Sequence, residues 1–122
     1  MKRMIYQVAV GKQSNLYQHC IQSVKDYCLK YNITHIVQND PILKIRPDIS
    51  RTGRSKEAVE RLGYLPIYEK ENAFTHLPNF DQVAIVDSDI YIRPNSPNIF
   101  DTLDNKFAFG AVAERELPCA KK

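Results

Sequence analysis

The chain has 122 residues, of which 43% are hydrophobic and 25% are charged, and its formal net charge is +3. This length fits one domain with a core of its own, and the composition is that of a soluble globular protein, which excludes a disordered or fibrous chain. The sequence has no apolar run near the roughly 20 residues that a membrane-spanning helix needs and no signal-peptide pattern, so we expect a cytoplasmic protein.

The first half of the chain predicts a strand, a helix and a second strand. Residues 4–10 alternate imperfectly between apolar and polar and end at Gly11, which predicts a strand followed by a sharp turn. From Asn15 onward, apolar residues recur every three or four positions, so we expect an amphipathic helix that Asn32 closes. Residues 34–38 are β-rich, and the order strand, helix, strand indicates parallel pairing.

The second half predicts a loop, two helices and two further strands. Residues 41–53 hold two prolines and no clean period, which is typical of a long loop. We expect helices over residues 55–62, stopped by a glycine, and over residues 66 to about 77, stopped by a proline. Residues 83–86 predict a strand buried on both faces, and residues 107–113 a last β-like stretch. These elements predict an α/β domain with a mostly parallel sheet flanked by helices.

Two aspartates directly follow the third predicted strand. In an extended chain, Asp87 and Asp89 lie on the same side, roughly 7 Å apart, while Ser88 faces away. Carboxylates that share one site repel each other unless a proton or a cation lies between them. Oxygen ligands favour Mg²⁺ or Mn²⁺, which take further ligands from a substrate diphosphate. Such a pair can also merely cap a turn or a helix, but its place at the carboxyl end of a buried strand favours a ligand site.

Three stretches resemble glycosyltransferases of the GT-A fold, particularly the family-eight-like and related retaining enzymes. Residues 80–92 look like the metal-binding strand of that family, and residues 68–74 are similar to the helix before it. Residues 8–11, with Ser23 and Val24 downstream, resemble its first strand and helix, whose junction receives the nucleobase. The resemblance implies a Rossmann-like nucleotide-sugar-binding fold.

The resemblance also implies a role for individual residues. Asp87 and Asp89 would bind Mn²⁺ or Mg²⁺, and Lys70 would reach the sugar or phosphates of a nucleotide-diphosphate sugar, such as a UDP-sugar. The residues expected to bind the nucleotide sugar are Ala9, Val10, Gly11, Lys70 and Ser88. Asp40, after the second strand, is a further candidate for a ribose or base contact, with a role in a turn as the alternative. The implied function is sugar transfer to an acceptor that the sequence does not identify.

Members of this fold are considerably longer, and their C-terminal half supplies a further metal ligand, often histidine, and the acceptor pocket. The chain is therefore expected to be a truncated, donor-binding half, a single domain over residues 1–122. A sheet that ends at residues 107–113 leaves an open edge or an apolar face, so we expect self-association, for example as a homodimer. A compact monomer in which residues 114–122 cover that edge is the alternative.

Two other functions fit parts of the pattern. A haloacid-dehalogenase-type phosphatase also places Asp-x-Asp after an apolar strand and uses the first aspartate as nucleophile. That motif usually lies near the N-terminus and has Thr or Val where this chain has Tyr91. A non-catalytic nucleotide- or metal-binding module, or a fragment completed by a partner chain, is the second alternative.

The remaining polar residues carry weaker signals. The histidines His19, His35 and His76 lie on separate predicted elements without ligand spacing, so packing or exposure is expected. The cysteines form no zinc motif and are odd in number, which favours reduced thiols at Cys20, Cys28 and Cys119. Residues 44–61 hold six basic and three acidic residues, which fits a solvated face or a phosphate-facing loop. Without interleaved aromatics or a known motif, nucleic acid is not an expected partner.

Overall fold

The computed structural model describes residues 1–46, 56–102 and 110 of the chain. Within these ranges, three parallel strands form one sheet in the order β2-β1-β3. The strands are β1 (Arg3–Val8), β2 (Thr34–Gln38) and β3 (Gln82–Ile85). The central strand β1 pairs on both sides, so that Tyr6 stands opposite both Ile36 and Ile85. The parallel pairing expected from the order of the elements is confirmed.

The helix α1 (Asn15–Lys30) connects β1 to β2 and is followed by the predicted stop. Asn32 has a positive φ of 56°, a conformation that asparagine tolerates better than most residues. The N–H of Ile33 then bonds the carbonyl oxygen of Cys28 at 2.8 Å, which satisfies one of the carbonyls left open at the end of the helix. Ile33 and Cys28 also pack in one core cluster, so this stop directs the chain into β2.

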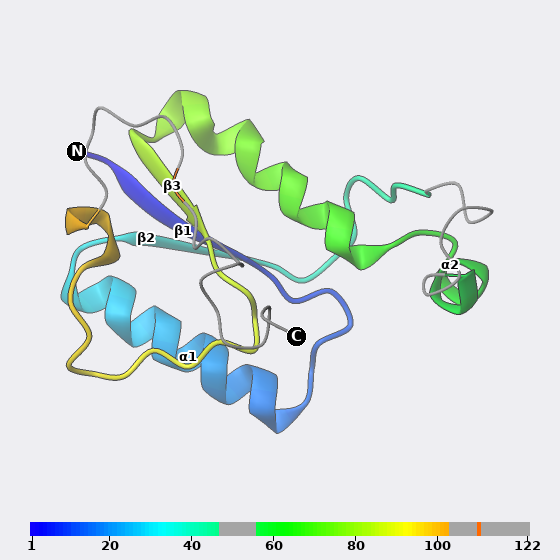
Figure 1. The fold of residues 1–122 in the computed structure, drawn as a ribbon, viewed down its shortest axis with the longest axis horizontal. Helices are drawn as coiled ribbons and strands as arrows, with labels where there is room; N and C mark the ends of the chain where they lie inside the picture. The colour runs from blue at the N-terminus through cyan, green and yellow to red at the C-terminus, as the bar shows by residue number, and fades with distance from the viewer. Residues whose placement is uncertain (47–55, 103–109, 111–122) are drawn as a thin grey trace, which may run out of the picture.

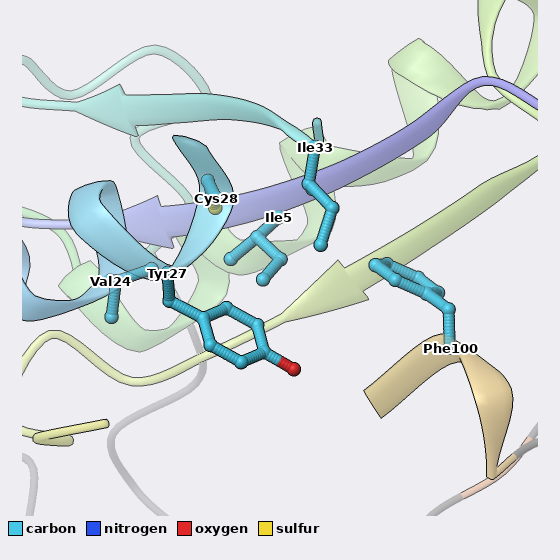
Figure 2. Packing of buried hydrophobic residues seen from close by; sticks show 6 residues of the cluster. All are labelled: Ile5, Val24, Tyr27, Cys28, Ile33 and Phe100. Atoms are coloured by element: carbon cyan, nitrogen blue, oxygen red, sulfur yellow. The ribbon is translucent and has the colours of Figure 1, made fainter. Parts of the chain in front are cut away.

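The sheet lies between two helices, with α1 on one face and the 3₁₀ helix η1 (Pro66–Asn79) on the other (Figure 1). Successive side chains of β1 serve opposite faces because strand side chains alternate. On one face Met4 and Tyr6 pack against Ala73 of η1. On the other face Ile5 packs against α1 in a cluster (Figure 2) that includes Val24, Tyr27, Cys28, Ile33 and Phe100. The central strand is therefore buried on both sides.

Both helices expected between the second and third strands are present. The helix α2 (Lys56–Leu62) stops at Gly63, whose positive φ of 81° accompanies a bond from its N–H to the carbonyl oxygen of Val59 at 2.7 Å. The second helix, η1, begins at Pro66 as predicted, has 3₁₀ geometry and runs two residues past its predicted end. Pro78, which was expected to stop this helix, lies inside its last turn. A proline is tolerated there because its φ is helical and its missing N–H removes only one hydrogen bond.

Two predicted segments lie largely outside the described residues. The β-like stretch 107–113 is described only at Gly110, and the loop 41–53 only as far as Arg46. A short 3₁₀ helix, η2 (Ile99–Asp101), follows the segment after β3. None of the helices in the described part of the chain is both long and apolar enough to cross a membrane.

Candidate functional site

The ends of the three parallel strands lie along one edge of the sheet, which we call the carboxyl edge. Residues 9–11 follow β1, Asp40 follows β2 and residues 87–89 follow β3. The connection from β1 to β2 covers one face of the sheet with α1, and the connection from β2 to β3 covers the other with η1. The direction of winding therefore reverses between β1 and β3, and open α/β sheets bind ligands in the crevice at such a point. The fold brings the residues singled out in the sequence to this edge.

A tight turn follows β1 at the carboxyl edge. The N–H of Ala9 bonds the carbonyl oxygen of Gln38 at 2.8 Å, and the N–H of Lys12 bonds the carbonyl oxygen of Ala9 at 3.0 Å. Gly11 has a φ of 71°, as the third position of a type II turn requires. Ala9 and Val10 are buried, whereas Gly11 is exposed. The strand thus ends two residues before its predicted end, and Gly11 is the exposed part of the turn.

The chain leaves β3 through a second turn. The last ladder bond runs from the N–H of Val86 to the carbonyl oxygen of Tyr6 at 3.0 Å. The carbonyl oxygen of Asp87 then accepts from the N–H of Ile90 at 3.2 Å and from Nε2 of Gln7, also at 3.2 Å. Gln7 is fully buried in the central strand, so it anchors the first residue of the motif to the core.

The acidic motif Asp87-Ser88-Asp89 is not extended, in contrast to the geometry assumed from the sequence. Ser88 and Asp89 form a turn, because aspartate and serine favour turns where no neighbouring strand continues the ladder. Both aspartates are exposed, and Ser88 is 7% exposed. The aspartates are thus accessible to a ligand, while a shared cation site and a contact between Ser88 and a nucleotide sugar stay predictions.

Lys70 of η1 reaches the first aspartate of the motif. Its ammonium group forms an ion pair with Oδ1 of Asp87. The two side chains are 38% and 54% exposed, so solvent screens the pair and it contributes little to stability. The helix before β3 therefore places a cationic group beside the motif. A contact between Lys70 and a phosphate or sugar stays a prediction.

Glu69, the residue before Lys70, has an entirely buried side chain. Its Oε2 accepts from the N–H groups of Ile42 and Leu43 at 3.0 and 2.9 Å, and its Oε1 accepts from the N–H of Lys44 at 2.8 Å. Burial by itself would raise the pKa of Glu69, but these bonds and one from the Gln38 side chain outweigh burial and lower the pKa. The carboxylate therefore stays charged and holds the backbone after β2.

A buried chain of hydrogen bonds continues from this carboxylate across the sheet. Nε2 of Gln38 donates to Oε2 of Glu69 at 3.0 Å and to the carbonyl oxygen of Asp40 at 2.9 Å. Oε1 of Gln38 accepts from the hydroxyl of Tyr6, and that hydroxyl accepts from Nδ2 of Asn72 at 2.8 Å. Asp40 itself is exposed. The network links β1, β2, η1 and the segment after β2 on the face of the sheet that η1 covers.

Sequence reasoning did not identify this network. The available signal was a glutamine within each of two predicted strands, Gln7 and Gln38, because a polar side chain on a buried strand needs a hydrogen-bonding partner. Two partners of Gln38, the side chains of Glu69 and Tyr6, lie 31 and 32 residues away in sequence. Their identity therefore depends on the tertiary structure.

The histidines have separate partners, as the sequence predicts. His19 stacks on Tyr91 with ring centroids 5.2 Å apart, and the ring of His76 lies 5.5 Å from that of Tyr6. His35 contacts Oε1 of Gln7 at 2.7 Å, and burial together with the charge of Lys25 lowers its pKa. No group of three or more histidine, cysteine, aspartate or glutamate side chains in the described ranges has an arrangement that could hold a metal ion. A cation at residues 87–89 would need further ligands from a substrate or water.

The segment after the motif is held along α1 by side-chain hydroxyl groups. The N–H of Ile92 bonds Oγ of Ser23 at 3.0 Å. The hydroxyl of Tyr27 donates to the carbonyl oxygen of Pro97 at 2.6 Å and accepts from the N–H of Ile99 at 2.7 Å. The sequence places Tyr27 on the core stripe of the helix, and its ring is in the core, but its hydroxyl has this additional role.

Comparison with known proteins identifies a similar fold. No protein-family model and no curated protein matches the sequence. A similar solved structure is that of a glycosyltransferase involved in the glycosylation of the major capsid of PBCV-1, with a TM-score of 0.50 and 17% sequence identity. The match covers 85% of this chain and 46% of that chain, so this chain spans about half the length of that protein. The likeness shows a glycosyltransferase-like α/β fold.

Proposed function

We propose that this chain is the donor-binding part of a GT-A-type glycosyltransferase and binds a nucleotide-diphosphate sugar together with a divalent cation. The observation that carries the proposal is the position of residues 87–89, with two exposed carboxylates, at the carboxyl edge where the winding of the sheet reverses. The ion pair between Lys70 and Asp87 adds a cationic group at the same place. The likeness in fold to a solved glycosyltransferase supports the proposal.

The exposed groups of the motif fit a hard divalent cation. Asp87 and Asp89 offer carboxylate oxygens, which Mg²⁺ and Mn²⁺ prefer. These ions commonly take only one or two carboxylates from the protein and fill their other positions with water and substrate phosphates. When bound, the cation supplies positive charge that stabilises a diphosphate leaving group. The small number of protein ligands therefore agrees with a cation that binds together with its nucleotide.

The residues of the carboxyl edge then have distinct roles in donor binding. Lys70 contacts a phosphate or the sugar of the donor, in exchange for its present contact with Asp87. The turn at residues 9–11 and Asp40 lie on the β1 and β2 side, where the nucleoside would bind. In the transfer, the bond from the anomeric carbon to the diphosphate oxygen breaks and a bond to an acceptor hydroxyl oxygen forms. The proton of the acceptor hydroxyl passes to water or to the nucleoside diphosphate as the latter leaves.

Isothermal titration calorimetry with uridine diphosphate and Mn²⁺ tests this proposal. We expect the wild-type chain to bind the nucleotide only with the metal present, and Asp87→Asn and Asp89→Ala to bind it at least tenfold more weakly. The matched control is Asp26→Asn, an exposed aspartate on α1, which should bind like wild type. Binding that is unchanged by a chelator, or unchanged in Asp89→Ala, would show that the pair does not hold a cation needed for nucleotide binding.

Two activity assays separate the proposed function from its alternatives. Release of sugar from a UDP-sugar or a related donor, lost in Asp87→Asn, supports a glycosyltransferase. Hydrolysis of an aryl phosphate that depends on Asp87 would instead favour the dehalogenase-type reaction, in which an aspartate is the nucleophile. Metal-dependent nucleotide binding without either activity would favour a binding module.

A further inference from the structure

The backbone after β2 binds a carboxylate in the way that loops bind anions. Three successive N–H groups, those of Ile42, Leu43 and Lys44, point at the two oxygens of Glu69. Lys44 has a positive φ of 49°, and left-handed residues occur in the turns whose consecutive N–H groups converge on an anion. No lysine or arginine forms an ion pair with Glu69 among the described residues, so backbone dipoles and one side-chain amide stabilise this buried charge.

The amide of Gln38 makes this arrangement specific. Both N–H groups of its side chain are accounted for, since Nε2 donates to Glu69 and to the carbonyl oxygen of Asp40. Its Oε1 accepts from Tyr6, and the reversed amide orientation would place an oxygen against the oxygen atoms of Glu69 and Asp40. Hydrogen bonds therefore hold residues 40–44 at both ends: Gln38 binds the start of the segment and Glu69 binds its end.

Glu69 and Lys70 are neighbours on η1 but contact different parts of the carboxyl edge. Glu69 holds residues 42–44, after β2, and Lys70 contacts Asp87, after β3. One short stretch of η1 thus sets the positions of the segments on both sides of β1. A loop held in one conformation loses less entropy when a ligand binds than a loop that must first become ordered.

We infer that Glu69 is a positioning residue of the donor site, which holds residues 40–44 in the conformation that receives the nucleoside of the donor. This inference rests on the proposed function. Glu69 is buried and does not touch the ligand; its effect passes through the backbone that it binds. If Glu69→Gln lowers the population of the binding-competent loop tenfold, the apparent Kd for the nucleotide rises tenfold. The phosphate end of the site, at Asp87 and Lys70, keeps its own contacts.

The test compares Glu69→Gln with Glu71→Gln, because Glu71 is an exposed glutamate on the same helix. Calorimetry with Mn²⁺ and uridine diphosphate should show about tenfold weaker binding for Glu69→Gln and no change for Glu71→Gln. Binding of Mn²⁺ with inorganic pyrophosphate, which lacks the nucleoside, should be the same in all three proteins. A purely structural role of Glu69 would weaken both ligands equally, and equal binding of uridine diphosphate by all three proteins would likewise overturn the inference.

Amide hydrogen exchange provides a second measurement that does not depend on the ligand. In Glu69→Gln the amides of residues 42–44 should exchange at least tenfold faster, while those of α1 keep their protection. Unchanged exchange at residues 42–44 would overturn the inference even if binding were weaker. If the wild-type chain binds no nucleotide while Glu69→Gln still shows fast exchange at residues 42–44, the proposed function is overturned. The role of the loop in donor binding then falls with it.

Substitutions at Lys44 keep the test valid if Glu69→Gln does not fold. Lys44→Pro removes the N–H that bonds Oε1 and cannot adopt the positive φ, so it should reproduce the faster exchange and weaker nucleotide binding. Lys44→Gly keeps the N–H and adopts a positive φ readily. It should bind uridine diphosphate like wild type, and an equal loss of binding in Lys44→Gly would show that the lysine side chain, rather than the loop conformation, matters.

Discussion

Lys70 is the residue whose position most directly connects the fold with the proposed site. Its ion pair with Asp87 is partly exposed on both sides, and such pairs contribute about 0–1 kcal/mol to stability. In the proposed complex the same ammonium group would contact a diphosphate, which carries more negative charge than a single carboxylate and attracts the ammonium more strongly. We therefore propose that Lys70 serves donor binding more than folding.

We expect Lys70→Ala to bind a UDP-sugar with Mn²⁺ roughly tenfold more weakly, which corresponds to about 1.4 kcal/mol. Its melting temperature should stay close to that of wild type, because the pair with Asp87 adds little stability. Calorimetry and a thermal melt measure the two quantities. Lys70→Arg, which keeps the charge, should recover part of the binding. Unaltered binding in Lys70→Ala would identify Lys70 as an ordinary surface lysine.

Glu69 makes stability depend on pH in a defined direction. Because its folded-state pKa is lowered, it stabilises the fold above the ordinary pKa of glutamate, about 4.3, and this contribution is lost as the pH falls through the folded pKa. Urea unfolding of wild type and Glu69→Gln should therefore show the largest difference in unfolding free energy near pH 7 and a smaller one near pH 3. A difference that does not vary with pH would contradict the charged state assigned to Glu69.

At the scale of elements, α1 both fills the core and holds the chain that returns from the motif. Tyr27 contributes its ring to the cluster around Ile5 and its hydroxyl to the backbone of Pro97 and Ile99. Tyr31 adds a bond from its hydroxyl to the carbonyl oxygen of Ser96 at 2.8 Å. The helix thus connects the packing of the sheet with the course of the chain after β3.

Removal of the Tyr27 hydroxyl should lower the free energy of unfolding more than removal of the Tyr31 hydroxyl. Tyr27→Phe leaves the N–H of Ile99 and the carbonyl oxygen of Pro97 without this partner, and we expect a loss of about 1–3 kcal/mol in unfolding free energy. Tyr31→Phe removes one bond, so about 1 kcal/mol is expected. Urea titration measures both values. Equal stability of Tyr27→Phe and wild type would mean that its two hydrogen bonds are fully replaced by water.

At the scale of the whole molecule, η1 exposes two apolar side chains close together. Phe74 and Leu77 are 59% and 48% exposed and lie three residues apart, which places them on the same side of a 3₁₀ helix. Exposed apolar groups that lie together favour association between molecules. The self-association expected from the sequence therefore has a candidate surface in the described part of the chain, although residues 107–113, on which that expectation was based, lie mostly outside it.

We expect the mass measured by light scattering after size exclusion to rise with concentration into the high micromolar range. The double substitution Phe74→Ser and Leu77→Ser should keep the protein monomeric, because it removes the apolar groups from that face of η1. Leu16→Ser, at an exposed leucine on α1, serves as the control and should associate like wild type. A clean monomer of the wild-type chain at these concentrations would contradict the prediction.

The sequence predicted the described strands, the helices α1, α2 and η1, and the edge of the sheet at which the candidate residues lie. It did not predict η2, and the expected burial of the third strand on both faces is wrong, because the strand lies at the edge of the described sheet and Ile85 is 41% exposed. Strands and helices follow from the spacing of apolar residues, and Asn32 and Gly63 follow the helices that they were expected to stop. Once the strands are parallel, residues that follow different strands must lie on one edge, so the common location of residues 9–11, Asp40 and residues 87–89 was also predictable.

Only the tertiary structure decided the contacts within that edge. The turn at Asp87, the partner of Lys70 and the burial of Glu69 depend on residues 17 to 80 positions away in sequence. A local sequence pattern predicts which side of an element is apolar. It does not predict which polar groups contact each other when the elements pack. Glu69 lies on a helix with exposed polar neighbours and resembles a surface residue in the sequence. It is buried because the backbone after β2 supplies the hydrogen bonds that a carboxylate needs away from water.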